Sequence, residues 1–507
     1  MWQRYTLYDL RVIGHYLGVL VLFFSLALVV PLVTALVFQE WEPATRYLFA
    51  IGVSMVVGSL LRMLRIEPGR LNRQQALAVT GLAWIVLAFM ASIPLYLSGH
   101  YLSYLDALFD GVSALTTTGA SIIQDVDHLS NADNMWRYVM SLVGGLGLIV
   151  IALSFGLFGK GAGSSLFASE GRSEHVVPNI VQSARLIAKI TAVIICVAAV
   201  VIAVLCFAIG MDPVRSCLHG LWLSVACFCT GGFSPMSQSI AYYHSFAIEV
   251  VLMLVMMLGT INFLLHSEVW KGRVEEVFRD FEVRTMGVWL VVMAAVLAGT
   301  MVASSGFSDL STMLRRGLFM VVTAFSTTGL QNVTTNQLTT LFPSGAFLIL
   351  AVLMAVGGSS GSTSGGIKFS RIGTIMKSMV VSVKQTLAPD TARVAVSYYH
   401  VGRRILSDEV VRSAMMVFAL YIAAYGIGSL AGIAYGYDAT QAIFDAVAMV
   451  SNGGLTSGVV AAGMPVPLEI LYILLMWAGR LEFMTLFALL TGLFVSLNPK
   501  RWGRRAK

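Results

Sequence analysis

The chain of 507 residues is 57% hydrophobic and only 12% charged, so it cannot cover itself with an ordinary water-facing surface. This composition excludes a soluble enzyme or a soluble binding domain and predicts an integral membrane protein. The formal net charge of +7 does not point to nucleic acid, because the basic residues gather in alternate connections between apolar segments.

Apolar segments along the chain predict helices that cross a membrane. Crossing a hydrocarbon core of ~30 Å takes about 20 apolar residues, and ten segments meet this requirement. Two come first and the others form four pairs: 12–38, 46–64, 75–98 with 136–158, 181–210 with 244–266, 285–305 with 343–388, and 410–436 with 467–496. Only the segment 343–388 shows an interruption, a run of Gly, Ser and Thr over residues 357–366.

The distribution of Lys and Arg predicts the orientation of these segments. Of the 33 basic residues, 27 belong to six groups: Arg4 with Arg11, 62–73, 160–189, 271–284, 368–412 and 500–507. If all six groups are cytoplasmic, every alternate connection agrees with the enrichment of Lys and Arg in short cytoplasmic loops. The sequence therefore predicts that both termini lie in the cytoplasm.

One pattern occurs four times, always in a connection on the opposite side. Each copy places an aromatic residue ten positions before a glycine and a valine seven positions before it. The copies are 109–119, 222–232, 319–329 and 444–454. Their glycines lie 113, 97 and 125 residues apart, too far for a solenoid. Because the apolar part of each copy is much shorter than the ~20 residues needed for crossing, each copy predicts a re-entrant segment between two helices.

The end of each copy carries the candidate binding chemistry. Its residues are Thr116, Thr117, Thr118 and Gly119, then Thr230, Gly231 and Gly232, then Thr327, Thr328 and Gly329, then Asn452, Gly453 and Gly454. Such turns offer backbone carbonyls, and glycine permits a positive φ. Four turns around one axis predict rings of neutral oxygens that replace the hydration shell of a monovalent cation, as in a K⁺ filter. The lack of carboxylates in the turns speaks against a divalent-cation site there. The alternative, glycines that merely end helices with capping threonines, explains one copy better than four.

The four turns also carry a family resemblance. The sequences Thr-Thr-Thr-Gly-Ala, Cys-Thr-Gly-Gly-Phe-Ser, Ser-Thr-Thr-Gly-Leu and Ser-Asn-Gly-Gly-Leu, each between two apolar segments, resemble the Trk/Ktr/HKT superfamily of potassium transporters. The extra N-terminal pair of segments and the stretch Gly-Arg-Leu-Glu-Phe-Met-Thr-Leu over 479–486 resemble its bacterial TrkH/TrkG branch. The fourth turn departs from the other three, because Asn452 stands where they have threonine.

The resemblance implies a fold and a function. The fold is an all-α integral membrane protein with four pseudo-symmetric helix–re-entrant pore loop–helix repeats around one pore, plus two N-terminal helices. The function is potassium uptake across the bacterial inner membrane through a gated, channel-like pore. The implied assembly is a homodimer among membrane lipids, controlled by a cytoplasmic TrkA-like partner that binds the nucleotide, so this chain needs no cofactor of its own. In the superfamily, serine at the first filter glycine is associated with sodium passage, whereas all four positions here are glycine.

The interruption over 357–366 is a candidate gate. Glycine costs about 1 kcal/mol in a helix interior, so this run, with Gly357, Gly358, Gly361, Gly365 and Gly366, breaks the helix; Lys368 follows it directly. The resemblance implies an intramembrane loop that lies under the filter and obstructs the pore. The alternative is a flexible linker, which Gly/Ser composition usually indicates.

Arg480 is a second candidate gating residue, since it lies inside the last apolar segment. A charged side chain there costs about 2.5–3.5 kcal/mol on insertion scales and should face a cavity or a partner. Glu482, two residues on, projects to a different helix face. The resemblance implies that Arg480 lies in the permeation path beneath the filter, and the alternative is a structural salt bridge.

Two carboxylates and two charged segments have more open interpretations. Asp110 and Asp445 directly follow the leading aromatic of their copies. They either attract cations at the outer mouth or cap the start of a helix. Segments 271–284 and 385–404 are candidate docking surfaces for a cytoplasmic partner.

Two further functions compete with a potassium channel. An ion-coupled symporter, driven by H⁺ or Na⁺, or a mixed K⁺/Na⁺ channel would use the same pore, and Glu482 is the best-placed carboxylate for coupling. A membrane enzyme lacks support, because no HExxH, GxSxG or Walker sequence is present. The repeats divide the chain into 1–73, 74–160, 161–270, 271–388 and 389–507.

Overall fold

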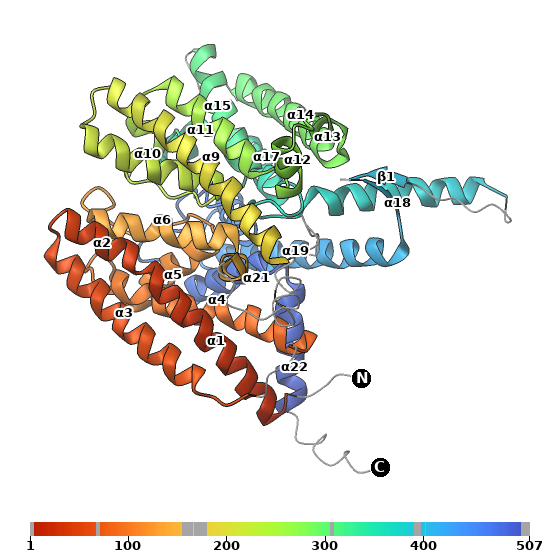
Figure 1. Cartoon of the computed structure of the whole chain (residues 1–507). Helices are drawn as coiled ribbons and strands as arrows, with labels where there is room; N and C mark the ends of the chain where they lie inside the picture. Colours follow the sequence, from red (N-terminus) through yellow and green to blue (C-terminus); the bar gives the residue numbers. More distant parts are fainter. Residues whose placement is uncertain are drawn as a thin grey trace, which may run out of the picture.

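The computed structural model describes residues 5–66, 71–154, 166, 180–304, 309–389, 397–400 and 402–497. Nearly all of its regular elements are helices (Figure 1). In chain order they are α1 (Leu7–Ala27), α2 (Val29–Val37), α3 (Trp41–Arg62), α4 (Arg73–Tyr96), α5 (Tyr104–Leu115), α6 (Asn131–Leu146), α7 (Leu148–Ser154), α9 (Ile180–Ala208), α10 (Pro213–Phe228), η1 (Ser239–Tyr243), α11 (Phe246–Gly259), α12 (Phe263–Trp270), α13 (Glu275–Arg279), α14 (Phe281–Ser304), α15 (Leu310–Phe325), α16 (Thr335–Leu341), α17 (Ser344–Ala355), α18 (Phe369–Leu387), β1 (Ser397–Tyr399), β2 (Arg403–Ile405), α19 (Asp408–Ala434), α20 (Ala439–Val450), α21 (Val466–Arg480) and α22 (Met484–Leu497).

Four short helices, α5, α10, α15 and α20, correspond to the four copies of the sequence pattern. Each starts at a residue whose side-chain oxygen accepts a backbone N–H of the first turn: Ser103, Asp212, Asp309 and Asp438. They contain 12, 16, 16 and 12 residues, which makes them about 18–24 Å long. This is too short for a hydrocarbon core of ~30 Å. The predicted re-entrant segments are therefore present, and we call these four elements the pore helices.

The pore helices lie in a closed arrangement. Each packs against the helix before it and the helix after it in its own repeat. In addition, the second helix of every repeat packs against the pore helix of the next one: α6 on α10, α11 on α15, α17 on α20, and α21 on α5. Because the last pair joins the fourth repeat to the first, the four repeats surround one axis.

The second long segment of every repeat is broken, which the sequence analysis expected only for the third. The chain is interrupted at Gly147 between α6 and α7, and α11 and α12 meet at an angle of 103°. The prediction of unbroken segments over 136–158, 244–266 and 467–496 was wrong. In the fourth repeat, α21 and α22 meet at 112° because Glu482 and Phe483 both have a positive φ. Hydrophobicity could not reveal these breaks, since the residues on both sides remain apolar.

The helices that remain unbroken are long and apolar enough to cross a membrane. Among the described residues these are Leu7–Val37, Trp41–Arg62, Arg73–Tyr96, Val181–Ala208, Phe281–Ala303 and Asp408–Ala434. The bent pairs α11 with α12 and α21 with α22 pass the same test when each is taken as one span. The predicted boundary between the first two repeats, at 160/161, lies outside the described residues.

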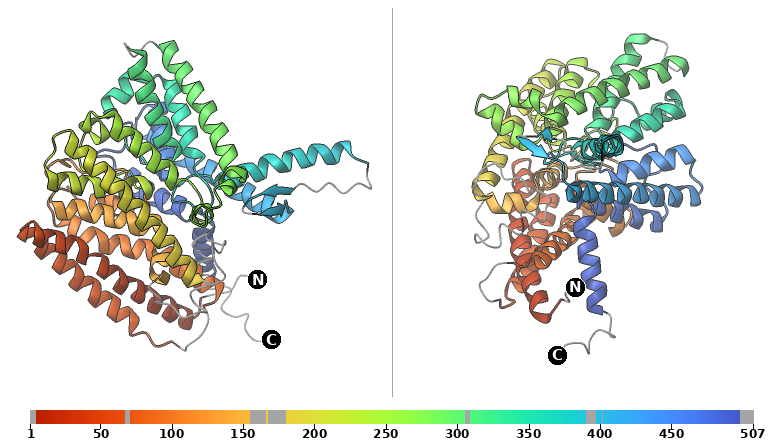
Figure 2. Two further views of the ribbon diagram at one scale, coloured as in Figure 1. Left: turned by 45° about the horizontal axis from the view of Figure 1, so that its top comes forward. Right: turned by 90° about the vertical axis from the view of Figure 1, so that its right-hand side faces the viewer.

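One face of the molecule carries a long projection. Helix α18 and the two-stranded hairpin β1–β2 extend from the helical body (Figures 1 and 2). The hairpin is antiparallel, with Ser397 paired to Ile405 and Tyr399 to Arg403. The two ends of the described chain also lie together, since the backbone N–H of Tyr5 donates to Ser496 Oγ at 2.9 Å. This agrees with the prediction that both termini are on one side.

The N-terminal helices are fastened to the first repeat by a buried ion pair. Arg46 of α3 donates to Asp133 Oδ2 of α6 at 3.0 Å, and Tyr47 donates its hydroxyl to Asp133 Oδ1 at 2.8 Å. All three side chains are buried. The same Arg46 also reaches Glu42 at 3.4 Å, but the Glu42 side chain is 79% exposed. One arginine thus has a buried and an exposed carboxylate partner.

This arrangement gives a matched test of what holds the N-terminal helices in place. Replacing Asp133 by Asn should cost about 3–5 kcal/mol of stability, because it leaves Arg46 buried without its anion. Replacing Glu42 by Gln should cost only about 0–1 kcal/mol. Thermal unfolding of the purified protein in detergent, followed by tryptophan fluorescence, measures both. Equal shifts in the two variants would show that the buried pair does not fasten α3 to α6.

Candidate functional site

The four pore helices end in turns of the same conformation. Each turn has a non-glycine residue in the left-handed region, with φ of 57° at Thr117, 50° at Thr230, 53° at Thr327 and 51° at Asn452. Two residues later each has a glycine with positive φ: 82° at Gly119, 66° at Gly232, 95° at Gly329 and 65° at Gly454. A side chain with positive φ is strained unless its surroundings hold it. The predicted fourfold equivalence therefore extends to the backbone.

Hydrogen bonds between turn and pore helix hold this conformation. The N–H that follows each left-handed residue donates to a carbonyl five residues earlier, at 2.8 Å from Thr118 to Ser113, 2.7 Å from Gly231 to Ala226, 3.0 Å from Thr328 to Thr323, and 2.7 Å from Gly453 to Ala448. The left-handed residue itself donates to a carbonyl three residues earlier. This pair of bonds is the Schellman motif that commonly ends a helix with glycine. Here threonine or asparagine occupies the glycine position.

The four glycines lock the turns to one another. A Cβ atom built on any of them would lie against a backbone carbonyl oxygen of the next repeat: 2.5 Å from Gly231 for Gly119, 2.0 Å from Thr328 for Gly232, 2.8 Å from Gly453 for Gly329, and 1.9 Å from Thr118 for Gly454. The contacts run from repeat 1 to 2, 3, 4 and back to 1. The four carbonyls thus belong to one closed ring, which we call the carbonyl ring. Only glycine lets the turns approach this closely.

Side chains around the carbonyl ring are buried and hydrogen-bonded. Thr116 Oγ1 lies 2.8 Å from Thr118 Oγ1, and Ser326 Oγ lies 2.7 Å from Thr328 Oγ1 in the equivalent place. Asn452 Nδ2 donates to Thr118 Oγ1 of the neighbouring repeat at 3.0 Å. A threonine at this position has no amide to make that bond, which gives the departure of the fourth turn a structural reason.

Asp110 and Asp445 have a role that neither interpretation of the sequence foresaw. Both lie in the middle of a pore helix rather than at its start, and both are almost fully buried. Asp110 accepts the N–H of Ile122 at 3.0 Å, and Asp445 accepts the N–H of Ser457 at 2.7 Å, twelve residues later in each case. The carboxylates therefore hold the segment that leaves the turn, and they do not face the outer mouth.

The run 357–366 forms a packed loop directly beneath the turns. The Gly365 N–H donates to Thr327 Oγ1 of the third turn at 2.7 Å. A Cβ on Gly365 would lie 1.9 Å from the Ser451 carbonyl of the fourth repeat. Thr363 Oγ1 donates to the carbonyls of Phe228 at 2.8 Å and Gly259 at 2.9 Å in the second repeat. These contacts argue against a flexible linker.

The other glycines of the loop allow it to fold on itself. A Cβ on Gly357 would lie 2.0 Å from the Gly365 carbonyl, and one on Gly358 would lie 2.8 Å from the Thr260 carbonyl. Gly361 and Gly366 have φ of 67° and 66°. The loop therefore needs glycine for its own compact shape as well as for its contacts with neighbouring repeats.

Arg480 lies between the first turn, the loop and the first repeat. Its Nη1 donates to Thr117 Oγ1 at 3.1 Å and to the Thr363 carbonyl at 3.2 Å, and its Nη2 donates to the Gly144 carbonyl. Glu482, which the sequence could not pair, contacts Arg371 of α18. Arg480 thus donates to neutral oxygens of the first turn and the loop, as expected for a side chain beneath the turns.

A cavity of about 220 Å³ lies beside these groups. Its lining includes Asn452 from the fourth turn, Gly365 from the loop, and the charged residues Lys368, Arg480 and Glu482. The Lys368 ammonium donates to the Ser364 carbonyl. The structure therefore brings the predicted turn and gate residues to one place, with a positively charged cavity below the carbonyl ring.

Comparison with known proteins agrees with this geometry. The family model described as TrkH, cation transport protein, matches residues 45–493. The chain is 30% identical to the Trk system potassium uptake protein TrkH of Escherichia coli strain K12 over 500 residues, covering 96% of this chain and 99% of that protein. It is 28% identical to an uncharacterised cation transporter of Methanocaldococcus jannaschii, covering 97% of both chains.

A solved structure shows the same fold. The crystal structure of the potassium transporter TrkH from Vibrio parahaemolyticus matches with a TM-score of 0.79 at 24% identity, covering 97% of this chain and 99% of that one. The predicted fold class, an all-helical membrane protein with re-entrant segments, is confirmed. The match to the family model over most of the chain settles the assignment: the protein belongs to the TrkH family of cation transport proteins.

Proposed function

We propose that this chain is a gated potassium uptake protein whose selectivity filter is the carbonyl ring. The observation that carries the proposal is the mutual contact of four glycines with four carbonyls in a closed cycle. Rings of carbonyl dipoles can replace the water around K⁺ without a fixed charge that would hold the ion too tightly. The relatives named as Trk potassium uptake proteins match along their whole length, which supports the same substrate here.

The intramembrane loop and Arg480 are the gate in this proposal. The loop contacts turns or helices of the second, third and fourth repeats, and Arg480 joins it to the first turn. A K⁺ ion that leaves the carbonyl ring toward the cavity meets this obstruction. A fixed positive charge ~6 Å from the ion costs about 3 kcal/mol at an effective dielectric constant of about 20, which lowers cation occupancy roughly a hundredfold.

Control comes from the cytoplasm in this proposal. Helix α18 follows the loop directly and continues into the projection that carries the hairpin. A TrkA-like, nucleotide-binding partner that pulls or turns this projection acts on the loop through α18. The basic residues of this segment support a cytoplasmic location in a bacterial inner membrane, and a homodimer would place two such projections side by side.

The filter assignment predicts the effect of a single added side chain. Replacing Gly232 by Ser puts a Cβ 2.0 Å from the Thr328 carbonyl, so the carbonyl ring must open locally. We expect the K⁺/Na⁺ permeability ratio to fall about tenfold, equivalent to about 1.4 kcal/mol. Reversal potentials of the purified protein in planar bilayers measure this ratio.

Replacing Gly210 by Ser is the matched control for that experiment. Gly210 also has a positive φ, 94°, but nothing lies within 4 Å of a Cβ built there. This variant should suffer the same kind of backbone strain and keep the wild-type permeability ratio. An unchanged ratio in the Gly232 variant would contradict the filter assignment.

The gate assignment predicts that removing the charge of Arg480 opens the path. Arg480→Gln should raise K⁺ flux per inserted protein by up to roughly a hundredfold, from the Coulomb cost given above. Arg480→Lys keeps the charge and should remain close to wild type. Flux is measured in proteoliposomes and normalised to inserted protein. If Gln lowers the yield of folded protein and leaves the flux per molecule unchanged, the arginine is structural.

The loop assignment predicts that loosening the loop raises flux without partner or nucleotide. Thr363→Val removes the two hydrogen bonds that tie the loop to Phe228 and Gly259 while keeping the side-chain volume. Ser362→Ala, whose hydroxyl bonds only lie within the loop, should change basal flux much less. Loss of flux in a folded Thr363→Val protein would mean that the loop supports conduction rather than obstructing it.

A further inference from the structure

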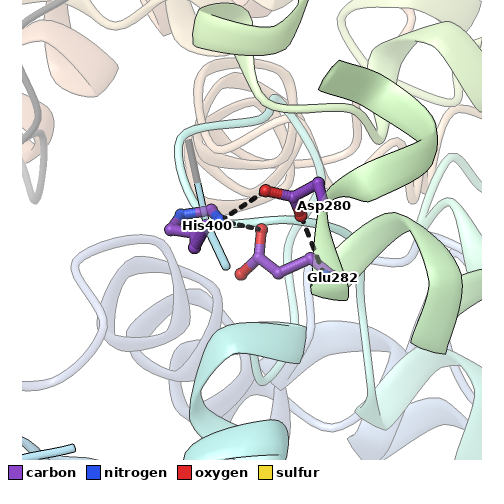
Figure 3. A group of neighbouring side chains, drawn as sticks. All are labelled: Asp280, Glu282 and His400. Atoms are coloured by element: carbon purple, nitrogen blue, oxygen red, sulfur yellow. Dashed lines mark hydrogen bonds and ion pairs between the residues drawn. The ribbon is translucent and has the colours of Figure 1, made fainter. Parts of the chain in front are cut away.

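A cluster of metal-ligating side chains lies away from the carbonyl ring, where the hairpin meets the start of α14 (Figure 3). Asp280, Glu282 and His400 are all buried, with 0%, 0% and 4% of their surfaces exposed. Asp280 and Glu282 lie at the junction of α13 and α14, and His400 lies in the turn of the hairpin more than a hundred residues later. The fold alone brings them together.

The three side chains point their ligand atoms at one spot. His400 Nδ1 lies 3.0 Å from Asp280 Oδ2 and 3.9 Å from Glu282 Oε2. Ligand atoms of all three residues lie within 4.8 Å of one another. Tetrahedral bonds of about 2.0–2.2 Å to a metal place ligand atoms roughly 3.3–3.5 Å apart. The two observed separations bracket that distance, so a small shift of the side chains accommodates an ion.

The surrounding contacts fix the direction of these side chains. The Glu282 N–H donates to Asp280 Oδ1 at 2.9 Å, which turns the other oxygen, Oδ2, toward His400. The Phe281 ring packs edge-on against Tyr398 at 5.2 Å and against His400 at 5.9 Å. Oriented ligands with second partners of this kind are typical of metal sites in proteins.

A proton serves this arrangement less well than a metal ion. A protonated Nδ1 can donate to Asp280, but Glu282 at 3.9 Å is then beyond hydrogen-bond distance. The Lys377 ammonium lies over the rings of Phe281 and Tyr398, at 3.9 and 4.5 Å from their centres. A divalent ion contacts both carboxylates and the imidazole at once and balances two buried negative charges.

We propose that Asp280, Glu282 and His400 bind a divalent transition-metal ion of the zinc class. An imidazole nitrogen with two carboxylates suits Zn²⁺, whereas Mg²⁺ and Ca²⁺ select oxygen ligands alone. Three protein ligands leave the fourth position of a tetrahedral ion to water. The ion joins the hairpin to the start of α14.

The site also contacts the intramembrane loop. Glu282 accepts the hydroxyl of Ser359 and, at 3.4 Å, the N–H of Ser360. An ion that fixes Glu282 therefore fixes one end of the loop as well. Metal binding itself does not depend on the proposed potassium function, and it is measured separately from flux.

Binding is tested with Zn²⁺ and the full-length, tag-free protein in detergent. Competition with a chromophoric chelator should show one Zn²⁺ per chain. His400→Ala should abolish this site, and Asp280→Asn, which keeps the oxygen that accepts the Glu282 N–H, should weaken it strongly even if the alanine variant fails to fold. Ser359→Ala, which removes a partner of a ligand, should weaken binding about 10–100-fold.

A matched control uses an exposed histidine beside a carboxylate. His128 Nδ1 lies 2.8 Å from Asp125 Oδ2, with both side chains exposed, and His128→Ala should leave Zn²⁺ binding unchanged. X-ray absorption of the Zn²⁺ complex should show nitrogen and oxygen ligands at about 2.0–2.2 Å and no sulfur. Absence of stoichiometric binding, equal binding by wild type and His400→Ala, or sulfur ligands from the cysteines would each overturn the proposal.

Discussion

The close approach of four backbone turns is the constraint on which the rest of this structure depends. Every turn glycine has the next repeat's carbonyl where a Cβ atom would be. The distance between neighbouring repeats is therefore set by backbone atoms, which cannot adjust as long side chains can. The four repeats can differ in almost every other residue, but they must deliver their turns to the same radius. The packing of each second helix on the next pore helix is the means by which they do so.

Holding the turns at that radius requires support outside them, and the repeats obtain it in different ways. In the first and fourth repeats a buried carboxylate, Asp110 or Asp445, holds the segment that leaves the turn. In the third repeat Gln331 lies in that segment, and its carbonyl accepts the N–H of Ile240 at 2.8 Å, while its own N–H donates to Ser239 Oγ at 3.1 Å. Left-handed threonine or asparagine costs of order 1–3 kcal/mol. That strain persists because these contacts determine the path on both sides of the turn.

The sequence predicted what repetition and composition can reveal. Four glycines in register predicted four equivalent turns, and the Gly/Ser run predicted the break in the third repeat, because both are local signals. The breaks beside Gly147 and Glu482 were missed, since apolar residues continue through them. The joint site of Asp280, Glu282 and His400 was also missed. No local pattern relates the start of α14 to a hairpin more than a hundred residues later, and only the packing of the hairpin on Phe281 brings the ligands together.

The intramembrane loop transmits position in both directions because its two ends are held by different structures. At one end, Ser359 and Ser360 bind Glu282, which lies beside His400 of the hairpin. At the other end, the Gly365 N–H binds Thr327 of the third turn. Six residues of chain separate Ser359 from Gly365, and these are packed among glycines that leave no room for slack. A displacement of the hairpin therefore cannot be absorbed within the loop. It must either break a hydrogen bond to Glu282 or reach the Thr327 side chain of the third turn.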